Sequence, residues 1–340
     1  MQSKRIKIYS YAAALALAIP QYGQMSNPLL GLAQSDDGAQ IQPVMGVLGS
    51  AGLAPAIALP SSVVKSHLAP GQGWALADDA SGGLGLLKFS EGSLSAYQLI
   101  GNAAGGADLV AFSPRGTSAA LATSKTGLLQ VLKGLDKSAT VLALTLPKTG
   151  ASLVSLAVTD AADLVVGLFD DGGVYLLYPG AAAQFVTRLG LPSGIAFLPD
   201  QSALIVADGA AGLVSVLDGV GASLQTRASV SVGPLSGTPV LVSSTLDGRT
   251  LLLAGLGSSS MVRVSLSDLT VSSISVPSVV SRIDRFGGGN EFLFSGASSD
   301  TALWILAAGG PELQTAFAQP HGISKVSPRL RPEIVVVGRN

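Results

Sequence analysis

Five ionisable residues hold a fixed place relative to short turn-like segments of the sequence. His67, Asp284 and Lys325 each stand three residues before such a segment, which reads PGQG, GGGN and PRLR respectively. Lys65 and Arg282 stand two residues further back, on the same side of an extended strand. Basic and imidazole side chains beside a carboxylate are suited to hold a small anionic or carbonyl-bearing ligand. We therefore take these five residues as a candidate ligand-binding sector.

Two other interpretations of the same residues stay open. The charges can form a salt-bridge network between neighbouring repeat units, sealing the structure where its ends meet. In a hydrolase, Asp284 or His67 would act as a base, and Lys325 or Arg282 would stabilise an oxyanion. No G-x-S-x-G, P-loop, dinucleotide, H-E-x-x-H or EF-hand pattern occurs, so no catalytic residue is assigned.

The residue inventory also limits metal and cofactor chemistry. The chain has no cysteine and two histidines. Thiolate metal sites, disulfides and three-histidine zinc sites are therefore excluded. We expect no metal site and no cofactor.

The elements that must position the five residues follow from an internal repeat. Seven turn-like tetrapeptides recur at intervals of 40 to 47 residues, and they begin at Pro70, Pro114, Thr159, Pro199, Leu246, Gly287 and Pro328. A short apolar segment follows each turn, and in most units a third and a more polar fourth segment come next. Segments of four or five apolar residues fit strands covered on both faces. Units of about 43 residues with four strands each are typical of propeller blades.

The sequence therefore predicts an all-β, seven-bladed β-propeller of four-stranded blades. The seventh unit stops after its second strand, Ile334–Val337, at the end of the chain. Pro43–Leu48 and Pro55–Leu59 supply the missing third and fourth strands, so the N- and C-terminal strands close the last blade and remove two open sheet edges. A ring of six blades with a separate terminal hairpin is the alternative.

Two of the turns carry a resemblance to known propellers. The segments Phe112–Gly116 (FSPRG) and Phe197–Asp200 (FLPD) resemble the F-S-P-D-G turns of the YVTN, NHL and lactonase-like propeller superfamily. The likeness extends over nearly all of the chain after its N-terminal segment, but at the level of the repeat. It implies the architecture and little about function.

The N-terminus has the pattern of an export signal. Lys4, Arg5 and Lys7 precede the apolar stretch Tyr11–Pro20, which is too short to span a bilayer. Small residues at Gly31 and Ala33 place the cut before Gln34. The sequence thus predicts a signal peptide over 1–33, a single propeller domain over 34–340 and an exported protein, periplasmic or secreted. An uncleaved anchoring helix is the alternative.

The composition and net charge limit the classes of partner that we expect this protein to bind. The net charge is −1, and the predicted mature chain, with 17 basic and 21 acidic residues, carries −4. This balance does not favour nucleic acid, and no membrane span follows the signal. We expect a monomeric, non-catalytic propeller that binds a protein, a polymer or a small ligand on one face or in its channel, with an unknown protein or envelope component as partner. A lactonase-like hydrolase and a structural component of the cell envelope are the alternatives.

Overall fold

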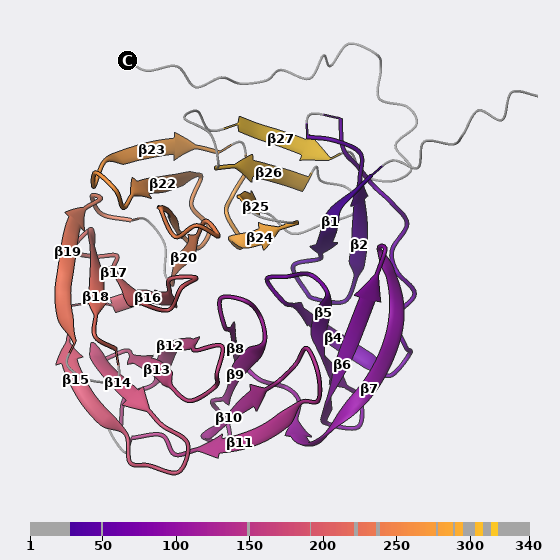
Figure 1. Ribbon diagram of the computed structural model, residues 1–340, viewed down its shortest axis with the longest axis horizontal. Helices are drawn as coiled ribbons and strands as arrows, with labels where there is room; N and C mark the ends of the chain where they lie inside the picture. The colour runs from indigo at the N-terminus through magenta and orange to yellow at the C-terminus, as the bar shows by residue number, and fades with distance from the viewer. Residues whose placement is uncertain are drawn as a thin grey trace, which may run out of the picture.

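Seven antiparallel sheets stand around a central axis in the computed structural model (Figure 1). The structure describes residues 28–318 except 49, 148–149, 191, 221–223, 236–238, 277, 288–289, 295–302 and 309–313. Within these ranges all regular elements are strands, and no helix could cross a membrane. The all-β class and the seven-bladed propeller are confirmed, and seven sheets exclude the six-bladed alternative.

Six of the sheets are blades of four strands each, paired in chain order from the axis outward. Blades one and two contain β4 (Val63–Leu68), β5 (Trp74–Asp79), β6 (Gly83–Ser90), β7 (Ser93–Ala104), β8 (Leu109–Phe112), β9 (Ser118–Thr123), β10 (Leu128–Lys133) and β11 (Thr140–Leu144). Blades three and four contain β12 (Leu153–Val158), β13 (Val165–Phe169), β14 (Gly173–Leu177), β15 (Gln184–Arg188), β16 (Pro192–Phe197), β17 (Ala203–Asp208), β18 (Leu213–Asp218) and β19 (Gln225–Ser231). Blades five and six contain β20 (Val240–Ser244), β21 (Thr250–Gly255), β22 (Ser260–Ser265), β23 (Val271–Ser275), β24 (Asp284–Phe286), β25 (Glu291–Leu293), β26 (Leu303–Ala307) and β27 (Gln314–Ala318).

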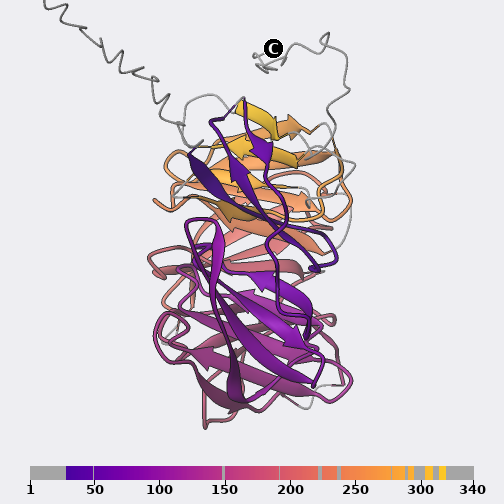
Figure 2. The same cartoon turned by 90° about the vertical axis from the view of Figure 1, so that its right-hand side faces the viewer.

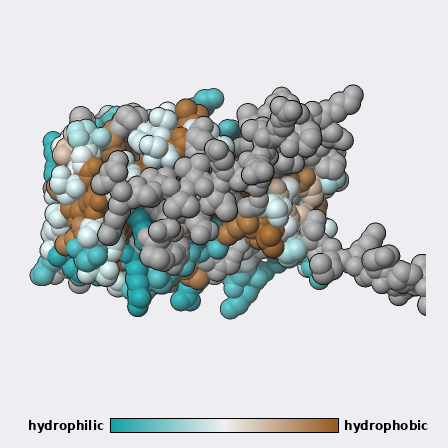
Figure 3. Space-filling model, turned by 90° about the horizontal axis from the view of Figure 1, so that it is seen from above, coloured by the Kyte–Doolittle hydropathy of each residue, from teal (hydrophilic) through white to brown (hydrophobic). Residues whose placement is uncertain are grey.

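Burial follows the position of each strand in its blade. The second strands β13 and β21 are buried along their whole length, because neighbouring blades cover both of their faces. The fourth strand β23 is exposed except at Ile274. The rim of the disc accordingly presents hydrophilic and hydrophobic residues side by side (Figure 3). Hydrophobic contact between adjacent blades is therefore what holds the ring together.

The turns between first and second strands link successive blades on one face of the disc. Trp74 Nε1 donates to Gly116 O (3.0 Å), and the Arg115 amide donates to Asp160 Oδ1 (3.0 Å). The Asp160 amide in turn donates to Gln201 Oε1 (2.8 Å). Equivalent turns meet one another, so the inner strands of these blades run in the same direction along the axis.

The seventh blade differs from the prediction. It is a three-stranded sheet of β1 (Leu29–Gln34), β2 (Ile41–Met45) and β3 (Gly52–Leu53), which lies beside blade six (Figures 1 and 2). The first half of the predicted third strand, Pro43–Met45, thus belongs to the second strand of this blade. Residues 55–59 are not a strand, although the amides of Ala54 and Ile57 donate to carbonyls of β2. The predicted strand Ile334–Val337 lies outside the described residues.

β1 fills the innermost position between β24 and β4, and its chain direction is antiparallel to theirs. Ser66 N donates to Gly38 O, whereas Gln72 bonds to the backbone of Leu32, so residue numbers fall on one side as they rise on the other. β1 falls largely within the predicted signal peptide, and a cut before Gln34 would remove five of its six residues. Leu32 and Ala33 are buried, which explains why this apolar segment packs into the ring.

Candidate functional site

Four of the five predicted site residues line one cavity. We call it the sector pocket: it has a volume of about 260 Å³ and lies between blades six, seven and one. Lys65 and His67 come from β4, Asp284 begins β24, and Arg282 stands two residues before Asp284. Lys325, the fifth predicted residue, lies outside the described residues.

His67 and Asp284 both reach the sector pocket because they occupy equivalent positions in the hairpins of their first and second strands. His67 pairs with Leu76 and Asp284 with Leu293, and each pair leaves eight residues (68–75 and 285–292) between its partners. The same spacing holds for Ala111, Ala196 and Ser243, which the sequence pattern placed at this height in their blades. In the third blade the equivalent residue is Ala157 rather than Leu156, because the register there is displaced by one residue.

Gln34 joins the three blades around the sector pocket. Its side-chain amide nitrogen donates to Ser66 O and to Ser66 Oγ (3.2 Å), and its oxygen accepts from Leu68 N (3.0 Å). Arg282 reaches it from the opposite side, with Nη1 3.1 Å from Gln34 O and Nη2 3.2 Å from Gln34 Oε1. A single buried glutamine therefore connects blade six to blade one through β1.

Sequence analysis missed Gln34, because it assigned the preceding residues to a leader. The available signal was the segment Ser35–Gly38 (SDDG), a turn sequence flanked by two apolar stretches. Within this turn Asp36 Oδ1 accepts a hydrogen bond from Ser281 Oγ (2.8 Å), which also ties the N-terminal hairpin to blade six.

His67 faces a buried carboxylate. Its Nε2 lies 3.8 Å from Asp78 Oδ2, beyond hydrogen-bond reach, and this buried nitrogen has no hydrogen-bond partner among the described residues. Asp78 Oδ1 accepts from Gly106 N (2.8 Å). Burial alone would raise the pKa of Asp78, but the approach of His67, the Gly106 bond and the charges of His67 and Lys65 lower it below its usual range.

The two other cations of the sector pocket differ in how they are neutralised. Arg282 Nε donates to Asp284 Oδ2, so this pair is internally compensated. Lys65 forms no ion pair with a carboxylate in the described part of the chain. The seam interpretation thus accounts for Arg282 and Asp284, whereas Lys65 lines the sector pocket without such an ion pair.

A second cavity, of about 270 Å³, follows the central axis, and we call it the channel cavity. Each blade contributes the inner-strand residue whose hairpin position leaves six residues between it and its partner on the second strand. These seven residues are Gln34, Leu68, Phe112, Val158, Phe197, Ser244 and Arg285. Four of these seven side chains are apolar, and Arg285 is the one cation among them.

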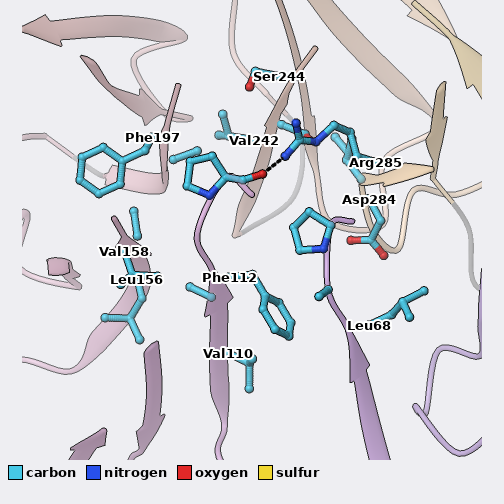
Figure 4. Close-up of a pocket in the computed structure, with 18 of the residues that line it drawn as sticks. Leu68, Val110, Phe112, Leu156, Val158, Phe197, Val242, Ser244, Asp284 and Arg285 are labelled. Atoms are coloured by element: carbon cyan, nitrogen blue, oxygen red, sulfur yellow. Dashed lines mark hydrogen bonds between the residues drawn. The ribbon is translucent and has the colours of Figure 1, made fainter. Parts of the chain in front are cut away.

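Arg285 extends from β24 across the channel. Its guanidinium donates from Nη2 to Pro114 O, in the first turn of blade two (Figure 4). Burial lowers the pKa of Arg285, and the negative charge of Asp160 partly opposes this effect. Sequence analysis did not single out Arg285, because its position relative to the turn was not the one compared between blades. Among the described residues no group of three or more metal-ligating side chains is present.

Comparison with known proteins reveals similarity at the level of the fold. No family model matches the sequence, and no curated protein matches it. A solved protein from Lactobacillus plantarum is similar, with 13% sequence identity and a TM-score of 0.57, and the match covers 87% of this chain and 97% of that one.

Two further structures are similar over comparable lengths. A "putative 6-phosphogluconolactonase" from Bacteroides uniformis shares 12% identity with a TM-score of 0.57, covering 85% of this chain and 96% of that one. A functionally unknown protein from Desulfotomaculum acetoxidans shares 17% identity with a TM-score of 0.55, covering 85% and 99%. These neighbours confirm the resemblance to lactonase-like and related propellers as a likeness of fold.

Proposed function

We propose that this chain is a non-catalytic binding propeller whose sector pocket receives a small ligand with a carboxylate or carbonyl group. The observation that carries the proposal is the pair Lys65 and His67: an ammonium group without an ion-pair partner in the described structure stands near an imidazole nitrogen that lacks a hydrogen bond. The Lys65 ammonium group can donate to an acceptor oxygen, so a ligand with such an oxygen would supply the partner that Lys65 lacks in the described structure.

The polar surroundings suit such a ligand. Arg282 and Asp284 neutralise one another, and the side-chain amide of Gln34 is hydrogen-bonded to the backbone of blade one. These groups give the pocket a fixed, hydrogen-bonded wall, which reduces the ordering cost of binding. Lys65 then supplies the donor that selects for an acceptor group, with His67 beside it in the pocket wall.

Export belongs to the same proposal. The basic and apolar N-terminal segment supports a cleaved leader, and the burial of Leu32 and Ala33 in β1 favours a cut upstream of Leu29. Mass spectrometry of the N-terminal peptide of the protein from its native host is the check. A mature N-terminus at Gln34 would contradict a cut upstream of Leu29, and an intact leader would contradict export by cleavage.

Calorimetric titration of the full chain tests the pocket, with gluconate and malonate as anionic probes and glucono-1,5-lactone as the carbonyl probe. We expect binding that weakens about tenfold in Lys65→Met, because a charge-assisted hydrogen bond is lost. Lys133→Met, at an exposed site on β10, is the matched control and should bind as the wild type does. Binding that Lys65→Met leaves unchanged, or no binding of any probe, would refute the proposal. Release of acid from the lactone faster than its spontaneous hydrolysis in buffer would support the hydrolase alternative instead.

A further inference from the structure

Arg285 is an unusual residue for the place that it occupies. Most of the residues that line the channel cavity have apolar side chains, among them Val110, Phe112, Val158 and Phe197. A guanidinium projects into this lining from blade six, toward the first turn of blade two (Figure 4). A cation in an apolar, partly closed space is costly unless an anion or several acceptors satisfy it.

The contacts of this guanidinium within the described residues use few of its hydrogen-bond donors. Pro114 O is its one hydrogen-bond acceptor among the described residues, whereas a guanidinium carries five N–H donors. No carboxylate within the described ranges lies at ion-pair distance from Arg285. Asp160 acts on it through its charge alone and is itself bonded to Arg115 N and to Gln201.

Asp284 is the other charged residue of the channel cavity, and it does not supply the missing partner. Its carboxylate Oδ2 accepts the hydrogen bond from Arg282 Nε, on the side of the sector pocket. The charge of Asp284 is therefore largely compensated by Arg282. Among the described residues, no carboxylate compensates the positive charge of Arg285 at ion-pair distance.

We propose that the channel cavity is a separate binding site for a small monocarboxylate with an apolar body, and that Arg285 holds the carboxylate. The guanidinium fork matches a carboxylate in a two-point hydrogen bond, and the ligand oxygens would replace Pro114 O as acceptors. The aromatic and aliphatic walls would cover the rest of the ligand.

The size and the lining of the cavity select this ligand class. A volume of about 270 Å³ lies below the range of roughly 300–1,000 Å³ usual for drug-sized ligands, so the ligand is smaller than these. The lining has no second cation and most of its side chains are apolar, so a second negative charge on the ligand would lack a charged partner among the described residues, which disfavours dicarboxylates and sugar phosphates. Aryl-alkanoates and short fatty acids fit both conditions.

This site does not depend on the function proposed for the sector pocket. The two cavities share Gln34, Leu68, Val110, Phe112 and Asp284 in their walls, but Lys65 and His67 line the sector pocket and Arg285 lines the channel cavity. Loss of binding in one set of variants and not in the other therefore identifies which proposal fails.

Titration calorimetry of the full chain with 3-phenylpropionate, and with its neutral analogue 3-phenylpropanamide, tests the proposal. We expect the acid to bind and to raise the unfolding temperature, and the amide to bind about tenfold more weakly or not at all, because it lacks the charge. Arg285→Gln should abolish the preference for the acid, and Arg285→Lys should weaken it, since an ammonium group cannot make the two-point bond. Arg249→Gln removes an exposed arginine in a blade-five turn and should bind as the wild type does.

Three results would overturn the proposal: equal binding of the acid and the amide by the wild type, unchanged binding in Arg285→Gln, or no binding of 3-phenylpropionate and octanoate at millimolar concentration. If Arg285→Gln does not fold, Arg285→Lys and the comparison of acid and amide binding by the wild type still test the proposal. Inorganic phosphate is the last probe, and binding as tight as that of the carboxylate would also contradict an apolar-bodied ligand.

Discussion

The side chain of Gln34 is hydrogen-bonded to the backbone of Ser66, and this contact fastens the N-terminal strand to the first complete blade. Gln34 lies on β1 and Ser66 on β4, so the bond crosses the seam where the two ends of the ring meet. Gln72 makes the matching contact from the blade-one turn, with both amide atoms on the backbone of Leu32 (2.8 Å each). Two glutamine side chains thus supply hydrogen bonds that join β1 to blade one, in place of strand pairing between β1 and β4.

Gln34→Ala should destabilise the whole ring. The change leaves Leu68 N, Ser66 O and part of Arg282 without partners in a buried place, which costs about 1–3 kcal/mol per group that stays unsatisfied. Urea unfolding followed by tryptophan fluorescence measures the loss, and Gln98→Ala on the exposed face of β7 is the control. Equal stability of the two variants would mean that the seam does not depend on Gln34.

Gly31→Ala tests how closely β1 packs between its neighbours. A Cβ at Gly31 would meet Gln72 Oε1, the ring of Phe286 (2.8 Å) and Gly287 N (3.1 Å). Such overpacking typically costs about 1–3 kcal/mol. Gly52→Ala in β3, where nothing lies within 4 Å of the added atom, should leave the unfolding free energy nearly unchanged. Thermal unfolding of the pair that shows no difference would place β1 elsewhere.

Deletion of the N-terminal strand should have a larger effect than deletion of the leader alone. A chain that begins at Asn27 keeps β1, whereas one that begins at Gln34 loses buried Leu32 and the backbone partner of Gln72. Burial of a leucine side chain contributes about 1.5–3 kcal/mol, so we expect the shorter chain to unfold at a clearly lower urea concentration. Identical midpoints for the two chains would show that β1 is dispensable to the ring.

Acid should destabilise the protein partly through Asp78. Its pKa in the folded state is lowered, so its contribution to stability is fully present above the unfolded value of about 4 and is lost as the pH falls through the folded value. Asp78→Asn should therefore reduce stability at pH 7 and flatten the decline below about pH 4. Urea midpoints from pH 7 to pH 2.5 measure this. Asp136→Asn, at an exposed turn, is the control, and an acid profile of Asp78→Asn that parallels the wild type would contradict the role of His67 and Gly106 as its partners.

Much of the candidate site was predictable, because turns fix strand register locally. The spacing of His67 and Asp284 from their turns predicted equal hairpin positions, and the structure confirms this. In blade three the turn-like segment that begins at Thr159 starts one residue earlier in its hairpin than in the other described blades with such a turn, so counting three residues back reaches Leu156 instead of the equivalent Ala157. Register within a hairpin depends on a few neighbouring residues, which is why sequence pattern suffices for most blades.

The sequence alone determined the blade repeat, the all-β class and the convergence of Lys65, His67, Arg282 and Asp284 on one sector. Only the tertiary structure decided that β1 fills the seventh inner position in the opposite direction, and that Gln34 therefore meets both Ser66 and Arg282. It also decided that Arg285 reaches Pro114 across the channel. The reason is physical: local turns and apolar spacing specify each hairpin, whereas contacts between residues 171 to 248 positions apart depend on how all blades pack to close the ring.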